Sequence, residues 1–196
     1  MKRYKQNKID KVSKILKDDG VISVPTDTVY GLCASINSRK AYEKLISIKN
    51  RPDTKPFPIM CINETQIKDI AIVNLDAEKL IHAFMPGPIT LVLNKKSNVL
   101  LHINNTGTEM DEKVAVRIAS SEVLKQLIQK IGCPIFLTSA NISGEPVCNT
   151  LDEIKEKLPT LDGILEGDVS FGQASTIVDC TNNIVKIQRT EPISLE

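Results

Sequence analysis

Apolar residues repeat along this chain with two periods that alternate. Segments with the helical period of 3.6 residues occur at about 5–19, 39–49, 64–70, 76–84, 121–131 and 151–158. Short runs rich in β-branched residues lie between or after them, at 21–24, 58–62, 89–93, 114–118, 135–138, 176–179 and 184–188. Strands that alternate with helices predict an α/β protein with a mostly buried, mixed β-sheet.

Two of the helical segments carry specific signals. In the first, Ile9, Val12 and Leu16 form an apolar stripe, so the lysines between them are expected to face solvent. In the last, Thr150 and Glu153 have the spacing of a capping box, and a proline follows the segment. The spacing predicts that this helix begins just after Thr150.

Length and composition predict one soluble domain over residues 1–196, with a core built mainly from aliphatic side chains. Apolar residues make up 41% of the chain and aromatic residues only 4%. The net charge of +1 argues against a protein held to nucleic acid by bulk electrostatics, which needs many clustered cations. The seven Lys or Arg among the first seventeen residues are interpreted as a solvated helix face, or alternatively as a weak contact surface for RNA or a partner.

The cysteines and the apolar runs bear on the compartment. The five cysteines form no CxxC pair and no metal-ligand spacing, which is typical of reduced thiols. No secretory apolar stretch and no run of membrane-spanning length is present. The sequence therefore predicts a cytoplasmic location.

Several common catalytic signatures are missing. The sequence contains no GxxxxGK[ST] phosphate loop, no GxGxxG fingerprint, no HExxH and no GxSxG. Of the two histidines, His82 lies among apolar residues of a predicted helix and is expected to be a half-buried structural residue. A hydrolytic triad or a zinc site is not expected.

Polar motifs follow the ends of three predicted strands, at 26–30, at Arg117 and at 139–144. Residues just past strand ends tend to line the ligand crevice of an open α/β sheet, which favours a small-molecule site. An Arg flanked by apolar residues either faces solvent or meets an anion. The hydroxyls and amide of 138–144 can cap a helix, or they can bind phosphate or ribose. Similarly, the cations of 49–55 can complement a helix C-terminus or bind phosphate.

Taken together, six segments in this order resemble the YrdC/TsaC family of threonylcarbamoyl-AMP synthases. They are PTDTVYGL (25–32), KNRPDTKP (49–56), MPGPITLVL (85–93), VAVRI (114–118), TSANISG (138–144) and STIVD (175–179). The resemblance runs from about residue 20 to residue 189. It implies a twisted, open, mixed β-sheet with flanking helices around a large, positively lined cavity.

The resemblance also implies a reaction and its partners. L-Threonine and bicarbonate give a carbamate, which attacks the α-phosphorus of ATP and yields threonylcarbamoyl adenylate and pyrophosphate. A tRNA-modifying threonylcarbamoyl transferase complex then receives the product. Mg²⁺ is expected to arrive with ATP and to be held largely by phosphates and water, because the motifs contain no carboxylate cage.

The family's functional residues map onto this sequence motif by motif. Those implied to bind ATP are Lys49, Arg51, Lys55, Lys113, Ser139, Asn141, Val147 and Arg189, of which Lys49 and Arg51 are the catalytic pair. Those implied to bind threonine are Thr28, Arg117, Leu137 and Ser175. Arg117 is the expected partner of the amino-acid carboxylate, since a planar guanidinium can bind a carboxylate at two points. No residue is assigned as a general base.

Three positions depart from the family pattern: Cys33 and Glu191 replace glycines, and Met60 replaces a common histidine. Two other functions stay open. One is the carbamoyl-adenylate chemistry of hydrogenase maturation, whose proteins are longer and contain Cys-rich zinc elements. The other is an RNA-binding module for ribosome or RNA maturation, which a salt titration of RNA binding beside a turnover assay would distinguish.

Overall fold

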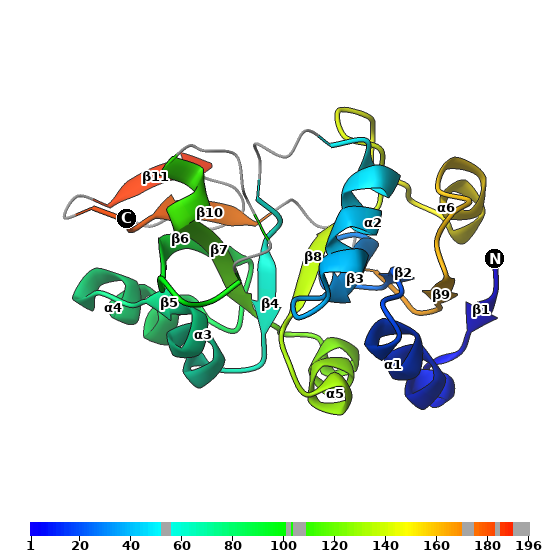
Figure 1. Cartoon of the computed structure of the whole chain (residues 1–196), viewed down its shortest axis with the longest axis horizontal. Helices are drawn as coiled ribbons and strands as arrows, with labels where there is room; N and C mark the ends of the chain where they lie inside the picture. The colour runs from blue at the N-terminus through cyan, green and yellow to red at the C-terminus, as the bar shows by residue number, and fades with distance from the viewer. Residues whose placement is uncertain (52–55, 101–102, 104–108, 170–174, 183–184, 190–196) are drawn as a thin grey trace.

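Eleven strands form one twisted β-sheet in the described part of the chain (Figure 1). This computed structural model describes residues 1–196 except 52–55, 101–102, 104–108, 170–174, 183–184 and 190–196. The strands are β1 (Arg3–Tyr4), β2 (Ile22–Val24), β3 (Gly31–Ser35), β4 (Ile59–Cys61), β5 (Ala71–Ile72), β6 (Ile89–Lys95), β7 (Lys113–Ile118), β8 (Ile135–Ser139), β9 (Gly163–Leu165), β10 (Thr176–Asp179) and β11 (Lys186–Arg189).

The sheet mixes parallel and antiparallel pairs, as the sequence predicts. Neighbouring strands follow the order β1-β9-β2-β3-β8-β4-β7-β6-β10-β11, and β5 pairs with β6 beside this path. The β1/β9, β2/β9, β4/β7 and β6/β10 pairs are parallel, and the others are antiparallel. The order brings motifs from distant parts of the chain onto adjacent strands.

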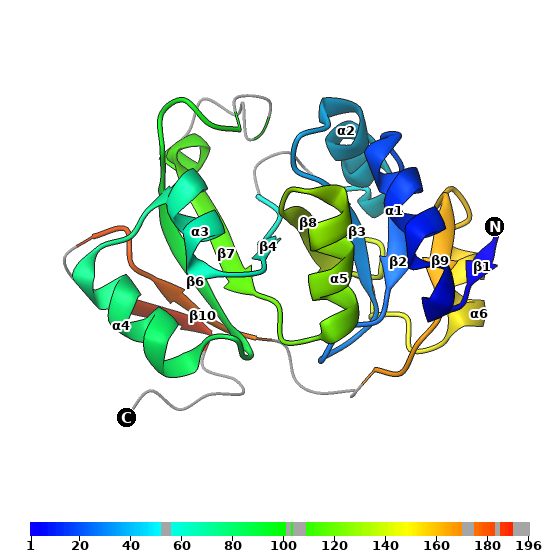
Figure 2. The same ribbon diagram turned by 90° about the horizontal axis from the view of Figure 1, so that it is seen from below.

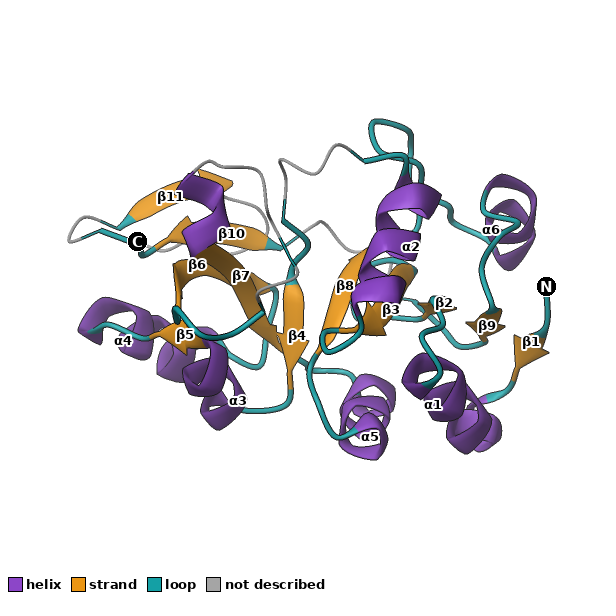
Figure 3. Cartoon of the chain, in the orientation of Figure 1, coloured by secondary structure: helices purple, strands orange, loops and turns teal. Residues whose placement is uncertain are grey.

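Helices cover the sheet on both faces. The α-helices are α1 (Ile9–Lys17), α2 (Arg39–Lys49), α3 (Glu64–Ile70), α4 (Leu75–Phe84), α5 (Glu122–Ile131) and α6 (Leu151–Lys157), with 3₁₀ turns η1 (Gln6–Lys8) and η2 (Glu109–Glu112). Seen from below, α1, α3, α4 and α5 lie on the near side of the strands (Figure 2). Helix α2 lies on the opposite side (Figure 3). None of the helices in the described ranges is both long enough and apolar enough to cross a membrane.

The predicted stripe of the first helix is buried. Ile9, Val12 and Leu16 pack with apolar residues of α5 and of the strands beneath, while the lysines of α1 are exposed. The predicted amphipathic helix, with its lysines facing solvent, is therefore confirmed. The five cysteines are free thiols and all are buried.

The prediction for His82 is wrong. Its side chain is 63% exposed and its Nε2 lies 2.9 Å from Glu64 Oε2, because α4 turns this position away from the core. The stripe of α4 that is buried contains Ala77 and Ile81 instead. An exposed ion-pairing role thus replaces the expected half-buried one.

Helix α6 begins with a modified capping box. The Thr150 hydroxyl accepts a hydrogen bond from Glu153 N at 3.1 Å, as predicted. The Glu153 carboxylate, however, accepts from Asn149 N at 2.7 Å, one residue before the N-cap. Both bonds satisfy backbone donors that a helix start leaves without partners.

Replacing Thr150 with alanine should lower the free energy of unfolding by about 1 kcal/mol, since the N-cap acceptor is lost. Chemical denaturation of the variant and of Lys155→Ala, a change on the same helix that keeps the cap, measures this difference. Equal midpoints for the two variants would show that the cap adds nothing to stability.

Side chains that alternate along β6 and β7 form part of the core on one face of the sheet and line a cavity on the other face. Along β6 and β7, one set of side chains packs in the same core as α3 and α4: Leu91, Leu93, Val114 and Val116. The alternate set lines the cavity: Thr90, Val92, Lys113, Ala115 and Arg117. Because successive strand residues point to opposite faces, these two sets face in opposite directions.

Candidate functional site

A cavity of about 710 Å³ opens over the strands β3, β4, β6, β7, β8, β10 and β11. Every residue predicted to bind threonine lines it: Thr28, Arg117, Leu137 and Ser175. Three of the residues predicted to bind nucleotide also line it: Arg51, Lys113 and Ser139. The fold thus gathers residues from all six sequence motifs around one volume.

Arg51 reaches the cavity from the loop that follows α2. Asn50 ends this helix in the left-handed conformation, with φ of 46°, so the chain turns sharply before Arg51. The Arg51 guanidinium donates from Nη2 to the Pro56 carbonyl at 3.1 Å and lies 4.9 Å from the centre of the Phe57 ring. Burial lowers the pKa of Arg51, and Tyr42 opposes that shift. These contacts hold a planar cation at the cavity wall.

Lys49 does not line the cavity and lies behind the 139–141 loop. Its side chain is among the most buried in the chain, at 2% exposed. Its ammonium donates to Ser139 O at 2.7 Å and to Asn141 Oδ1 at 2.6 Å. Burial lowers the pKa of Lys49 to about 8, and the charge of Arg51 acts in the same direction. Direct contact of Lys49 with a ligand therefore remains a prediction, whereas its contact with the 139–141 loop is observed.

Asn141 connects the residues of this loop to one another. Its Oδ1 accepts from Lys49 and from Ser139 Oγ, at 2.6 and 2.7 Å. Its Nδ2 donates to the carbonyls of Ile142 and Glu145, at 2.9 and 2.7 Å. All the polar atoms of this buried side chain are engaged within the protein, so Asn141 sets the shape of the loop that presents Ser139 to the cavity.

The remaining predicted nucleotide residues are placed differently. Val147 is half-buried in the loop after β8 and does not line the cavity. Lys113 begins β7 and does line it. Arg189 ends β11, where its backbone pairs with Ile177, but its side chain is outside the description. Lys55 lies outside the described residues.

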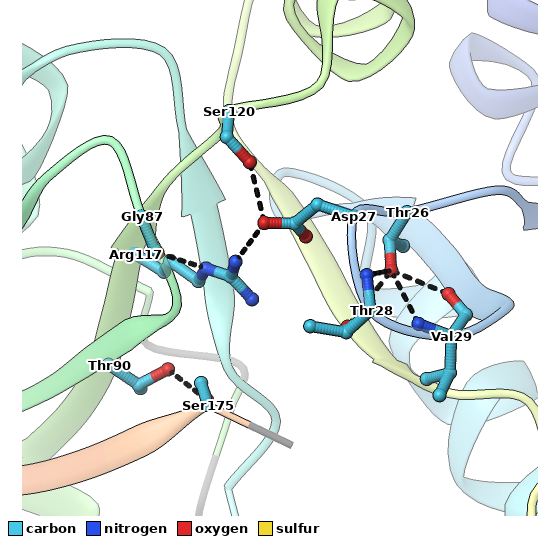
Figure 4. A network of polar contacts seen from close by, with 9 residues as sticks. All are labelled: Thr26, Asp27, Thr28, Val29, Gly87, Thr90, Arg117, Ser120 and Ser175. Atoms are coloured by element: carbon cyan, nitrogen blue, oxygen red, sulfur yellow. Dashed lines mark hydrogen bonds and ion pairs between the residues drawn. The ribbon is translucent and has the colours of Figure 1, made fainter. Parts of the chain in front are cut away.

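Arg117, which is predicted to bind threonine, is a buried cation of the cavity lining, at 7% exposed. Its Nη2 donates to Asp27 Oδ2, and its Nε donates to the Gly87 carbonyl at 2.8 Å (Figure 4). A Cβ at Gly87 would collide with the Phe84 carbonyl oxygen, so glycine allows this loop to adopt its path. Of the two expectations for an Arg in this motif, contact with an anion is confirmed. Burial lowers the pKa of Arg117, and the Asp27 charge opposes that shift.

Two hydroxyl pairs lie beside Arg117 (Figure 4). Thr26 Oγ1 accepts from Thr28 N at 3.1 Å and lies 3.1 Å from Thr28 Oγ1. Across the cavity, Thr90 Oγ1 lies 2.9 Å from Ser175 Oγ. Each predicted hydroxyl, Thr28 or Ser175, is therefore held by a neighbouring threonine that was absent from the predicted set.

Comparison with known proteins identifies the family. A family model named Sua5_yciO_yrdC and described as "Telomere recombination" matches residues 14–190. A protein of Methanocaldococcus jannaschii named "Putative threonylcarbamoyl-AMP synthase" is 32% identical over 169 residues, covering 85% of this chain and 77% of the relative. The Bacillus subtilis "Threonylcarbamoyl-AMP synthase" is 30% identical over 191 residues, covering 96% and 54%. This chain belongs to the Sua5/YciO/YrdC family.

A solved structure of this family contains an amino acid. The structure of Pyrococcus abyssi Sua5 complexed with L-threonine superposes with a TM-score of 0.83 at 28% identity, covering 95% of this chain and 56% of that one. The fold predicted from the resemblance, a twisted mixed sheet with flanking helices, is thus confirmed. The chain spans little more than half the length of the B. subtilis and P. abyssi relatives.

Two of the three departures from the Sua5/YciO/YrdC pattern, Met60 and Cys33, lie in the part of the chain that the structure describes. Met60 is buried and lines the cavity, so the common histidine is replaced by an apolar wall. Cys33 is fully buried in β3, within the core beneath α1 and α5. Burial raises the pKa of its thiol far above the usual range, so this thiol stays protonated. Glu191 lies outside the described residues.

Sequence reasoning missed several residues of this site, including Asp27, Thr26 and Thr90. Thr90 carries a signal in the sequence, because it is the polar residue in the otherwise apolar run 89–93. Asp27 and Thr26 lie within the first motif, but nothing in the sequence indicates that Asp27 reaches Arg117, ninety positions further along the chain. Only the strand order brings these two residues together.

Proposed function

We propose that this chain is a threonylcarbamoyl-AMP synthase, which condenses L-threonine, bicarbonate and ATP. The observation that carries this proposal is the convergence of Arg51, Lys113 and Arg117 with Ser139 and other hydroxyl groups on one cavity. Three cations around one volume suit a substrate with several anionic groups. The names of the M. jannaschii and B. subtilis relatives and the L-threonine bound by P. abyssi Sua5 support the same reaction.

The reaction proceeds in two balanced steps. The threonine amine first attacks the carbon of bicarbonate, forming a carbamate and releasing water. A carbamate oxygen then attacks the α-phosphorus of ATP. The bond between this phosphorus and the oxygen that bridges it to the β-phosphorus breaks, which releases pyrophosphate. Transfer of this kind needs reactants held in line and phosphate charge neutralised, more than covalent help from the protein. The absence of a general base from the predicted set is compatible with this requirement.

The nucleotide occupies the end of the cavity near Arg51 and Lys113. Arg51, whose guanidinium lines the cavity, is proposed to bind the phosphates. Ser139 offers a hydroxyl at the end of β8. Lys49 adds positive charge from behind this loop and fixes its shape. Lys55 and Arg189 are proposed to complete the phosphate contacts, as the family motifs imply.

Mg²⁺ is proposed to enter with ATP as part of the substrate. Asp179 is the one carboxylate among the cavity-lining residues that the structure describes. Its oxygens already accept hydrogen bonds from Thr181 N at 2.9 Å and from Gln188 Nε2 at 3.1 Å. A single engaged carboxylate does not form a metal cage, so phosphates and water are expected to supply most of the ligands.

Threonine occupies the opposite end, between Arg117 and the hydroxyls. Arg117 binds the α-carboxylate through the N–H groups that Asp27 and Gly87 leave available. Thr28 and Ser175 contact the polar atoms of the substrate, and the main chain at Leu137 completes the pocket. Met60 supplies an apolar wall of the size that a methyl group requires. A methyl contact discriminates threonine from serine by about 1–3 kcal/mol.

The product is proposed to pass to a tRNA-modifying threonylcarbamoyl transferase complex. The adenylate is a mixed anhydride, which water hydrolyses, so rapid transfer to an acceptor is expected. The buried thiols fit a reducing compartment such as the cytoplasm. A weak contact with RNA through the lysines of α1 remains a second proposal, supported only by their exposure.

Pyrophosphate release tests the proposed reaction. The purified chain is incubated with ATP, Mg²⁺ and bicarbonate, with and without L-threonine, and initial rates are measured. Threonine-dependent release is expected. Folded protein that releases no pyrophosphate under these conditions, but binds RNA in a salt-dependent manner, would favour the RNA-binding alternative.

The protonation of Lys49 should give the reaction a pH dependence. As pH rises through about 8, the pKa of Lys49, its ammonium loses a proton and positive charge beside the nucleotide falls. We therefore expect kcat/KM for ATP, measured at saturating threonine, to decline above that pH. A Lys49→Met variant should be slower at every pH and should lack this decline. The same decline in the variant would assign the titration to another group.

A further inference from the structure

Asp27 contacts the cation of the threonine site from the turn between β2 and β3. Its Oδ2 accepts a hydrogen bond from Arg117 Nη2 and another from Ser120 Oγ, the latter at 2.6 Å (Figure 4). The side chain of Arg117 is 8% exposed and that of Asp27 is 26% exposed. The ion pair is therefore largely shielded from water, where the interaction of two charges is stronger than at the surface.

The turn holds Asp27 in place from both sides of the residue. Thr26 Oγ1 accepts hydrogen bonds from Thr28 N and Val29 N, each at 3.1 Å, and donates to the Val29 carbonyl. These bonds fix the backbone around Asp27 without using its carboxylate. The carboxylate is thus free to reach across to Arg117, and Ser120 fixes it from the segment after β7.

Arg117 has five N–H donors, and the two observed bonds leave three for a ligand. The Gly87 carbonyl fixes the Nε edge and Asp27 fixes Nη2, so the plane of the guanidinium is set at two points. A guanidinium held at two points loses little further freedom when it binds a carboxylate. A buried cation also needs a counter-charge while the site holds no substrate, and Asp27 supplies that charge.

We propose that Asp27 is a positioning residue of the threonine site, which orients Arg117 for the substrate carboxylate and balances its charge between turnovers. This proposal rests on the proposed function and adds a residue to it. Asp27 acts through Arg117 and is not assigned a contact with the substrate. The sites for ATP are expected to be independent of it, because Arg51 and Lys49 bond to different groups.

A double-mutant cycle tests this dependence on Arg117. The quantity is kcat/KM for threonine, taken from the slope of pyrophosphate release at low threonine and saturating ATP. Asp27→Ala should lower it about thirtyfold or more and change KM for ATP less than about twofold. In an Arg117→Ala background, the same change should have an effect of less than about threefold. An equal loss in both backgrounds would overturn the proposal.

Two further variants separate positioning from general stability. Asp162 is a matched control, since its carboxylate also pairs with a cation, Lys44, and accepts a second hydrogen bond, from Val21 N, but neither partner lines the cavity. Asp162→Ala should leave kcat/KM for threonine within about twofold of wild type. Asp27→Asn keeps an acceptor oxygen without the charge, and should recover part of the loss seen in Asp27→Ala. No recovery, together with an equal loss in Asp162→Ala, would indicate a purely structural role.

An experiment without turnover distinguishes failure of this proposal from failure of the proposed function. Proton–nitrogen NMR of arginine side chains reports whether rotation of a guanidinium is restricted. Arg117 should show resolved Nη resonances in the wild type and averaged ones in Asp27→Ala. Unchanged Arg117 resonances in the variant would refute positioning by Asp27, whether or not the chain makes the adenylate. Wild-type protein that shows the expected resonances but no threonine-dependent release would refute the proposed function alone.

Discussion

Replacing Arg51 with alanine is expected to lower threonine-dependent pyrophosphate release by about a hundredfold or more, with the fold intact. The guanidinium lines the cavity and lies over Phe57, so it is already placed where the transferring phosphate would lie. Loss of one pre-positioned donor to developing charge typically costs about 10²–10³ in rate. Initial rates and a thermal unfolding curve of the same preparation measure both parts of this prediction.

Two variants make the Arg51 result specific. Arg51→Lys keeps the charge but loses the planar fork, so intermediate activity is expected. Arg39→Ala removes an exposed Arg that pairs with Glu43 on α2, and should leave turnover unchanged. Full activity in Arg51→Ala would rule out the proposed phosphate contact, and the nucleotide would have to bind elsewhere.

Replacing Arg117 with alanine should raise KM for threonine by about a hundredfold and leave KM for ATP within about twofold. The change removes the buried cation that is proposed to pair with the substrate carboxylate. Truncating one partner of a charge pair that is shielded from water costs about 2–5 kcal/mol. Titrations of each substrate, with the other saturating, separate the two constants. Calorimetric binding of threonine to the free protein gives a second measurement.

The reverse pattern would contradict the placement of the two substrates. If Arg117→Ala impaired the use of ATP alone, the nucleotide and threonine ends of the cavity would be exchanged. Arg117→Lys provides the matched control, since a lysine retains the charge but cannot bind a carboxylate at two points. Its KM for threonine should fall between those of the wild type and the alanine variant.

The helices and the main strands could be predicted from the sequence because their patterns are regular. The predicted segment 39–49 coincides with α2, and 176–179 coincides with β10. Strand β3 was missed because Gly31, Ala34 and Ser35 are small residues with weak strand preference. It forms because β2 and β8 pair with it on both sides, which is a tertiary effect.

The sequence indicated part of the candidate site's residues but not its geometry. The motifs indicated that Lys49, Ser139 and Asn141 belong together, yet not that the ammonium of Lys49 bonds to the loop behind the cavity. Whether the Lys49 side chain faces the cavity or the loop behind it depends on how α2 packs against β8. The Asp27–Arg117 pair depends on the order of strands in the sheet. Local patterns carry no information about either arrangement.

Mass spectrometry of the products tests the central claim most directly. The chain is incubated with ATP, Mg²⁺, L-threonine and carbon-13-labelled bicarbonate, and the nucleotides are separated at once. The expected result is threonylcarbamoyl-AMP that contains the labelled carbon, formed together with pyrophosphate. Formation of AMP or ADP without any adenylate that contains both threonine and the label, from folded protein, would contradict the proposed function.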